Sequence, residues 1–170
     1  MTITIDAIKS LREKTGAPLS DVRQALEKAG GDEAKAKEIL KQKGFEAARK
    51  RQGRATSVGR IGTYVHHDGR VAALVEINCE TDFVARTPEF SQFCGDVAMQ
   101  VASQNPLHVA KEELKAAEHE AKDVCLLEQA FIKDAGQSIG DLLTALIGKT
   151  GENIVIKRFK RFAVGEEIKA

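Results

Sequence analysis

The spacing of the apolar residues changes near residue 60 of this chain. Before that point apolar side chains recur every three or four residues, which is the period of an amphipathic helix. After it, two short strand-like runs, 61–67 and 71–77, flank Asp68-Gly69, a dipeptide typical of a tight hairpin turn. Helical segments followed by strands predict an α+β protein with two structural parts.

The N-terminal part is predicted to contain three short helices. Thr15-Gly16-Ala17-Pro18 interrupts the first, Gly30-Gly31 ends the second, and Asp32 is a suitable N-cap for the third. Gly44 is expected to end the third helix, because glycine is favoured just beyond a helix C-terminus. We therefore predict three parts of the chain: a three-helix bundle at 1–45, an exposed basic helical linker at 46–59, and an α+β core at 60–170.

The core is predicted to be a small antiparallel sheet packed with helices. The run 71–77 is apolar on both faces over most of its length, whereas an antiparallel strand with one solvated face alternates. We therefore expect this sheet to be covered on both sides. The other elements expected in the core are an amphipathic helix begun by Thr87-Pro88, a charged helix over 111–133, a helix begun by Ser138, and a last strand over 154–162.

Composition and charge exclude several classes of protein. The chain has 170 residues and a net charge of +1, so nucleic-acid binding would need a local basic patch. Its cysteines are widely separated, which argues against a disulfide framework or a zinc site and for reduced thiols in the cytosol. No apolar run approaches the roughly 20 residues that span a bilayer, and no signal peptide is recognisable. We expect a cytoplasmic protein that does not contact membranes.

No catalytic or metal-binding motif stands out. Gly148-Lys149-Thr150 matches only the end of a phosphate-binding loop, and it follows a predicted helix instead of opening one. His66 and His67 are neighbours in a strand-like run, so they are expected to point to opposite faces and not to share a metal ion. We interpret them instead as a pair of surface histidines that flank a turn. We expect no enzymatic activity, no cofactor and no metal site.

The last strand-like run carries basic residues that alternate with aromatic ones: Lys157, Arg158, Phe159, Lys160, Arg161 and Phe162. Such a strand can bind single-stranded nucleic acid. It can equally bury its aromatic side chains in a sheet and expose its charges, and we favour that interpretation because the chain as a whole has little positive charge.

The segment 78–86 connects a strand to the helix that begins near Thr87. Connections normally lie on the surface, which would place Phe83 and Val84 on an exposed tip. Phe83 could then anchor a partner, or it could instead fold back into the core. The residues alone leave both possibilities open.

Several stretches of the chain resemble elongation factor Ts of bacteria, in order along nearly its whole length. The matching stretches are Leu11 to Ala17, Ala25-Leu26, Gly31-Asp32, Lys43-Gly44, Val75 to Ala85, and Gly151 to Phe159. The resemblance implies a bundle like a ubiquitin-associated (UBA) domain followed by an α+β core. It also implies the short form of the family, which lacks the second core half and the coiled-coil insertion.

The resemblance further implies a guanine-nucleotide exchange factor whose partner is elongation factor Tu. Thr81, Asp82, Phe83 and Val84 would enter near the magnesium and phosphates, with Asp82 and Phe83 intruding and the other two flanking them. Pro18, Leu19, Ser20 and Asp21 of the bundle would contact the same partner, although this run departs from the usual family pattern.

Short members of the family act as homodimers, which agrees with a strand that is apolar on both faces. We therefore expect a homodimer through the core sheet. The sequence does not determine whether Cys79, Cys94 or Cys125 bridges two subunits. Two other functions remain open: a single-stranded RNA-binding protein that uses the basic linker and the last strand, and a ubiquitin-type adaptor that uses only the N-terminal bundle.

Overall fold

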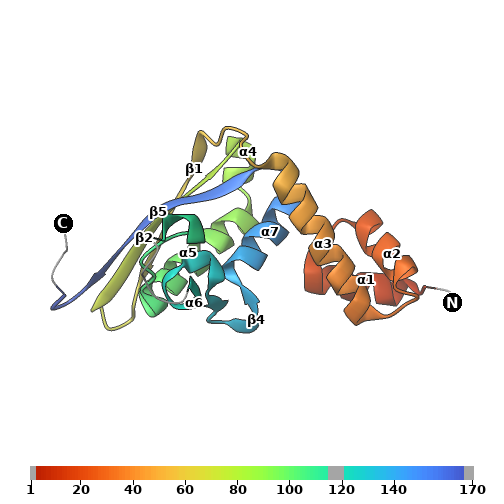
Figure 1. Cartoon of the computed structure of the whole chain (residues 1–170), viewed down its shortest axis with the longest axis horizontal. Coiled ribbons are helices and arrows are strands. Elements are labelled where there is room, and N and C mark those ends of the chain that lie inside the picture. Colours follow the sequence, from red (N-terminus) through yellow and green to blue (C-terminus); the bar gives the residue numbers. More distant parts are fainter. Residues whose placement is uncertain (1–2, 115–120, 167–170) are drawn as a thin grey trace. The chain divides into compact units, whose positions relative to one another are not determined.

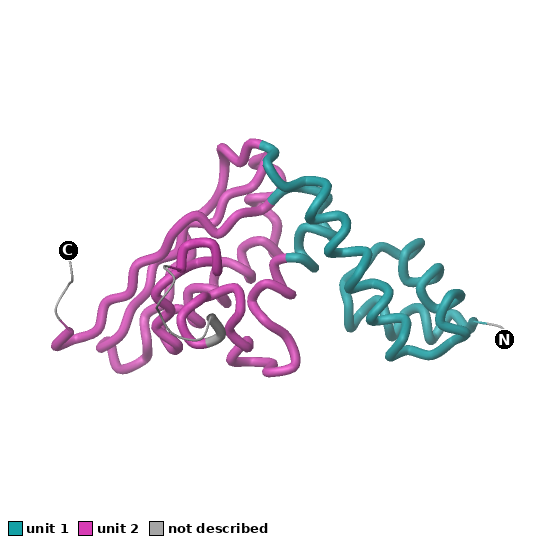
Figure 2. Tube along the Cα trace, viewed as in Figure 1, with its two compact units in different colours: residues 1–54, 144–153 teal, residues 55–143, 154–170 magenta. Residues whose placement is uncertain are grey.

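The computed structural model describes residues 3–114 and 121–166 of the chain. It divides into two compact units, residues 1–54 with 144–153 and residues 55–143 with 154–170 (Figure 2). Both helices and a small antiparallel sheet are present, so the predicted α+β class is confirmed. Within the described residues, no helix combines the length and apolar character that crossing a membrane requires.

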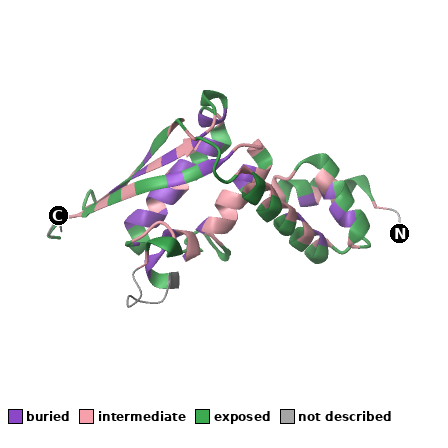
Figure 3. Cartoon of the chain, turned by 45° about the horizontal axis from the view of Figure 1, so that its top comes forward, coloured by how far each residue is buried: buried purple, intermediate pink, exposed green. Residues whose placement is uncertain are grey.

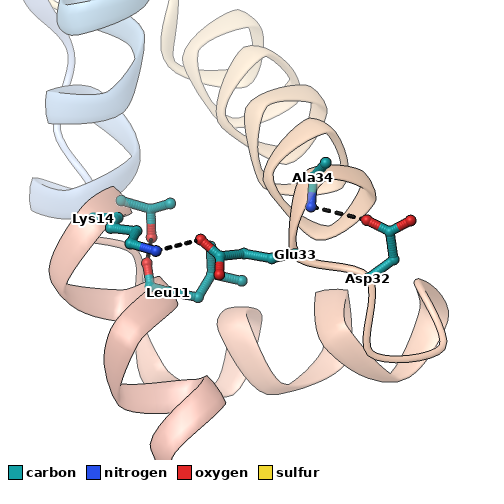
Figure 4. Close-up of polar contacts among 6 residues, drawn as sticks. Leu11, Lys14, Asp32, Glu33 and Ala34 are labelled. Carbon is teal, nitrogen blue, oxygen red and sulfur yellow. Dashed lines mark hydrogen bonds and ion pairs between the residues drawn. The ribbon is translucent and has the colours of Figure 1, made fainter.

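The first unit contains α1 (Ile5–Thr15), α2 (Leu19–Lys28) and α3 (Glu33–Arg51) (Figure 1). The predicted end of the first helix is confirmed, because Gly16 caps α1 with a left-handed φ of 65°. Asp32 caps α3 by accepting a hydrogen bond from the backbone N–H of Ala34 at 2.9 Å (Figure 4). It also accepts one from the N–H of Lys35 at 3.1 Å. The buried side chains at the centre of the bundle are Leu11, Val22, Ala25, Leu26, Ala36 and Leu40.

Helix α3 does not end at Gly44, and that prediction is wrong. The helix continues to Arg51, so the first residues of the expected linker are its last turns. A Cβ atom at Gly44 would lie 3.3 Å from Thr144 Cγ2 of α7 (Ile139–Thr150), and one at Gly148 would lie 3.8 Å from Gly44 Cα. Glycine therefore serves here for the close approach of two helices and not for a helix end.

The second unit is built on β1 (Val58–Val65), β2 (Val71–Cys79) and β5 (Ile154–Ala163), in the order β1-β2-β5. Both pairings are antiparallel, and Gly69 has a φ of 68° in the turn between β1 and β2. The predicted hairpin and last strand are thus confirmed.

One face of the sheet is covered by α5 (Pro88–Gln104). Buried residues of β2 and α5 gather where the helix lies against the strands (Figure 3). Gly62 of β1 lies close against α5, since a Cβ atom there would collide with the backbone oxygen of Cys94. No side chain fits in that space, so the distance between β1 and α5 depends on this glycine.

The other face of the sheet is exposed in the single chain, so the expectation of cover on both sides holds for only one side. Strand pairing places Ile61 beside Glu76, Leu74 beside Thr63, and Val65 beside Ala72. We call this surface the outer face. Its most exposed apolar side chains are Ile61 (56%), Val65 (64%), Leu74 (47%) and Phe162 (46%).

The charged stretch 111–133 is not one continuous helix, contrary to expectation. Its described residues form 3₁₀ turns at Lys111–Glu113 and Leu126–Glu128, the short helix α6 (Ala121–Val124) and the start of a small hairpin, β3 (Ala130–Phe131) and β4 (Asp134–Ser138). Residues 115–120 lie outside the described residues. The buried Gln100 side chain explains why the end of the stretch is not helical. It accepts a hydrogen bond from the Ile132 N–H and donates one to the Ala130 carbonyl. Such bonds to the backbone compete with helix formation.

The three cysteines, Cys79, Cys94 and Cys125, are buried thiols. Burial raises the pKa of Cys94 to about 12 and also raises the pKa of Cys125. A buried, protonated thiol is a poor nucleophile. In this fold the cysteines are therefore core residues and not candidates for a bridge between subunits.

The close contact at Gly62 can be tested by substitution. Gly62→Ala should lower the free energy of unfolding by about 1–3 kcal/mol, because the added methyl group forces β1 and α5 apart. Gly95→Ala, in α5, is the matched control, since a Cβ atom there meets nothing within 4 Å. It should raise stability by about 0.5–1 kcal/mol, the usual gain for Gly→Ala inside a helix. Urea denaturation followed by circular dichroism measures both, and equal stabilities for the two variants would contradict the packing described.

Candidate functional site

The segment between β2 and α5 forms a single helical turn, α4 (Asp82–Ala85), and not an open loop. Thr81 precedes it with extended backbone angles, and its hydroxyl oxygen accepts a hydrogen bond from the Val84 N–H at 3.4 Å. The Cys79 thiol donates to the Thr81 carbonyl at 3.1 Å. The start of the turn is therefore attached to the end of a core strand.

The single turn separates two neighbouring apolar side chains. Phe83 is 84% exposed, the highest value among the large exposed hydrophobic residues of the described chain, whereas Val84 is only 9% exposed. Ala85 is buried beside Val84, and α4 packs against β1, β2 and α5. Of the two positions left open for Phe83, the structure has the exposed one, and the alternative that it folds into the core is wrong. The exposed tip predicted for Val84 is also wrong, because this side chain anchors the turn.

Asp82 lies beside Phe83 on the exposed side of the turn. Its carboxylate pairs with the Arg86 guanidinium at 3.2 Å, and the two side chains are 63% and 81% exposed. An ion pair this exposed contributes only about 0–1 kcal/mol, so a partner could displace it at little cost. The four-residue spacing of Asp82 and Arg86 could have indicated this pair from the sequence.

The predicted partner-binding residues of the bundle lie at the start of α2. Pro18 is the N-cap residue, and Leu19 is 55% exposed in the first turn. Ser20 is also exposed. Asp21 is half-buried, and its carboxylate pairs with Lys43 of α3 at 2.8 Å. Three of these four residues are thus available on the surface, while Asp21 also ties α2 to α3.

The histidine pair does not have the arrangement expected for strand neighbours. His66 and His67 follow β1 in the turn, and their ring centroids lie 4.2 Å apart. The His66 ring also lies within hydrogen-bonding distance of the Tyr64 hydroxyl, at 3.0 Å. In the part of the chain that the structure describes, no group of three or more His, Cys, Asp or Glu side chains could hold a metal ion.

Comparison with known proteins agrees with the resemblance seen in the sequence. Residues 33–122 match the family model described as elongation factor TS. The proteins named elongation factor Ts from Carboxydothermus hydrogenoformans and Rubrobacter xylanophilus are 45% and 44% identical to this chain. They cover 96% and 95% of it, and the matches span 90% and 99% of their own lengths. The protein of the same name from Thermotoga petrophila is 43% identical, covering 98% of both chains. The chain therefore belongs to the elongation factor Ts family.

Proposed function

We propose that this chain is a guanine-nucleotide exchange factor for elongation factor Tu, which promotes release of GDP and entry of GTP during translation elongation. The observation that carries the proposal is the 84% exposure of Phe83 on a turn whose next two residues are buried. Membership of the elongation factor Ts family supports it. An exposed aromatic side chain on a well-anchored turn is suited to enter a partner as a wedge.

The exchange mechanism needs no chemical step. Phe83 would insert between elements that frame the nucleotide site, and the Asp82 carboxylate would disturb the surroundings of the magnesium ion. Magnesium requires near-ideal octahedral geometry, so a small displacement around it weakens its hold on the phosphates. Binding of nucleotide and of exchange factor are then reciprocally coupled, and nucleotide favours release of the factor. The protein would act in the cytoplasm without a cofactor or catalytic residue.

The N-terminal bundle would supply a second contact with elongation factor Tu. Leu19 and Pro18 present apolar surface at the start of α2, next to the exposed Ser20. A second attachment raises the effective concentration of the wedge near its target. Under this proposal the bundle chiefly sets affinity, and α4 chiefly sets the rate of nucleotide release.

We also propose that two copies pair through the outer face of the sheet. This face carries exposed apolar side chains and an ion pair between Glu76 and Arg158, at 2.6 Å. The hydrogen bond from Arg158 lowers the pKa of Glu76, so this carboxyl group stays ionised at neutral pH. A charge pair already hydrogen-bonded within the chain can be covered at a lower cost than an unpaired charge.

RNA binding through β5 receives less support from the side chains. Two of its four basic residues are engaged in ion pairs, Arg158 with Glu76 and Arg161 with Glu166. A strong electrostatic contact with phosphates needs several available cations. The exchange factor therefore remains the preferred function.

Removing the proposed wedge tests the function directly. Phe83→Ala should reduce stimulated GDP release from elongation factor Tu by about thirtyfold or more, which corresponds to the roughly 2 kcal/mol or more lost at a hot spot. The fold should be unchanged, because the side chain is exposed. Leu107→Ala is the control, since Leu107 is also apolar and 59% exposed. Release of a fluorescent GDP analogue measures both, and full stimulation by Phe83→Ala would refute the assignment.

The role of the Asp82 carboxylate can be separated from its ion pair. Asp82→Ala and Arg86→Ala remove the same contact, but only the first removes the carboxylate. We expect Asp82→Ala to lower the maximal rate of GDP release by about three- to tenfold, the effect of about 1 kcal/mol on a barrier, and Arg86→Ala to change it by less than about twofold. Equal losses in the two variants would show that the ion pair matters and the carboxylate does not.

Pairing through the outer face predicts a dimer at micromolar concentration. Leu74→Lys should produce monomers, because the new cation would lie beside Lys160, its register partner in β5, and burying these unpaired like charges would cost about 3–5 kcal/mol. Leu107→Lys adds the same charge at another exposed apolar site and should leave the dimer intact. Sedimentation velocity distinguishes the species, and a monomeric wild-type chain would overturn this part of the proposal.

A further inference from the structure

Thr87 occupies the junction between α4 and α5 and forms hydrogen bonds with both helices. Its hydroxyl donates to the Val84 carbonyl at 2.9 Å and accepts from the Phe90 N–H at 3.3 Å. Its own backbone N–H also reaches the Val84 carbonyl, at 3.0 Å. One side chain thus caps the start of α5 and holds the end of the turn that carries Phe83.

A helix as short as α4 cannot hold its shape alone. Isolated helices shorter than about 12 residues are only marginally stable in water. The turn is instead held from outside, by the Cys79 thiol at its start, by Thr87 at its end, and by the buried Val84 beneath it. Phe83 is too exposed for packing to fix its direction, so that direction depends on the backbone of the turn.

We propose that Thr87 is a positioning residue for nucleotide exchange, whose hydroxyl fixes α4 against α5 and thereby aims Phe83. This inference rests on the proposed exchange function. A wedge that is already ordered loses little conformational entropy when it inserts, whereas a loose one must be ordered at that moment. Loss of the hydroxyl should therefore slow nucleotide release more than it weakens the first contact with the partner.

The test compares two substitutions at this position. Thr87→Val keeps the size and branching of the side chain but removes the hydroxyl, and Thr87→Ser keeps the hydroxyl. Rates of GDP release from elongation factor Tu are measured over a range of factor concentrations. We expect Thr87→Val to lower the maximal rate about five- to tenfold and to change the half-saturating concentration by less than about twofold, with Thr87→Ser close to wild type.

Ser138→Ala controls for the general effect of losing a helix cap. Ser138 lies in the same compact unit as Thr87. Its hydroxyl accepts a hydrogen bond from the Asp141 N–H, at 3.0 Å, at the start of α7. Removal of this cap should destabilise the protein to a similar extent as Thr87→Val, measured by thermal unfolding, but should leave the maximal exchange rate unchanged. If the two variants lose the maximal exchange rate to the same extent, Thr87 has only a structural role and the proposal is wrong.

A second measurement reports on α4 without elongation factor Tu. The chain contains no tryptophan, so Phe83→Trp introduces a single fluorescent reporter at the exposed position. Time-resolved anisotropy should show more local motion of this tryptophan when Thr87→Val is added, and no change when Thr87→Ser is added. Equal motion in all three backgrounds would overturn the proposal. If Phe83→Ala itself leaves exchange intact, the proposed function fails, while the anisotropy still decides whether Thr87 orders the turn.

Discussion

The close packing of α5 on β1 is the contact on which the candidate site depends. At Gly62 the strand comes so near to the backbone of Cys94 that a Cβ atom would collide with it. This approach sets the position of α5 on the sheet, and α4 sits between the end of β2 and the start of α5. The site is therefore held at both ends by one core, which is the arrangement expected when a short projecting segment must keep its shape.

Packing against that core buries one of two neighbouring apolar side chains, Val84, and leaves the other, Phe83, exposed. The buried Val84 gains the favourable free energy of leaving water, whereas the exposed Phe83 forgoes about 1.5–3 kcal/mol that burial would provide. A well-packed chain rarely leaves a large aromatic side chain so exposed on an ordered turn. A partner that covers Phe83 would recover this free energy on binding, which connects the local structure with the proposed exchange function.

The fold could be predicted from sequence wherever a local rule applied without competition. Asp32 as a cap, Gly16 as a helix end and Gly69 in the hairpin all behave as their chemistry requires. The predictions failed where tertiary contacts outweigh local preference. Gly44 lies inside a helix, where another helix passes close to it. The charged stretch after residue 110 is broken where the buried Gln100 donates a hydrogen bond to the Ala130 carbonyl and accepts one from the Ile132 N–H. Neither neighbour is close in sequence, so no periodicity could reveal it.

The sequence by itself determined the fold class, the positions of most helix caps and strands, and, through its resemblance to a family, the segment Thr81 to Val84 as the candidate site. It could not determine which of Phe83 and Val84 faces solvent, because both are apolar and their spacing suits either side. The tertiary structure decided that point: packing of α4 against the sheet and α5 buries Val84 and leaves Phe83 outside. It also decided that one face of the sheet stays uncovered in the single chain, since only the three-dimensional arrangement shows that α5 covers one side of β2 and that Leu74, on the other side, is exposed.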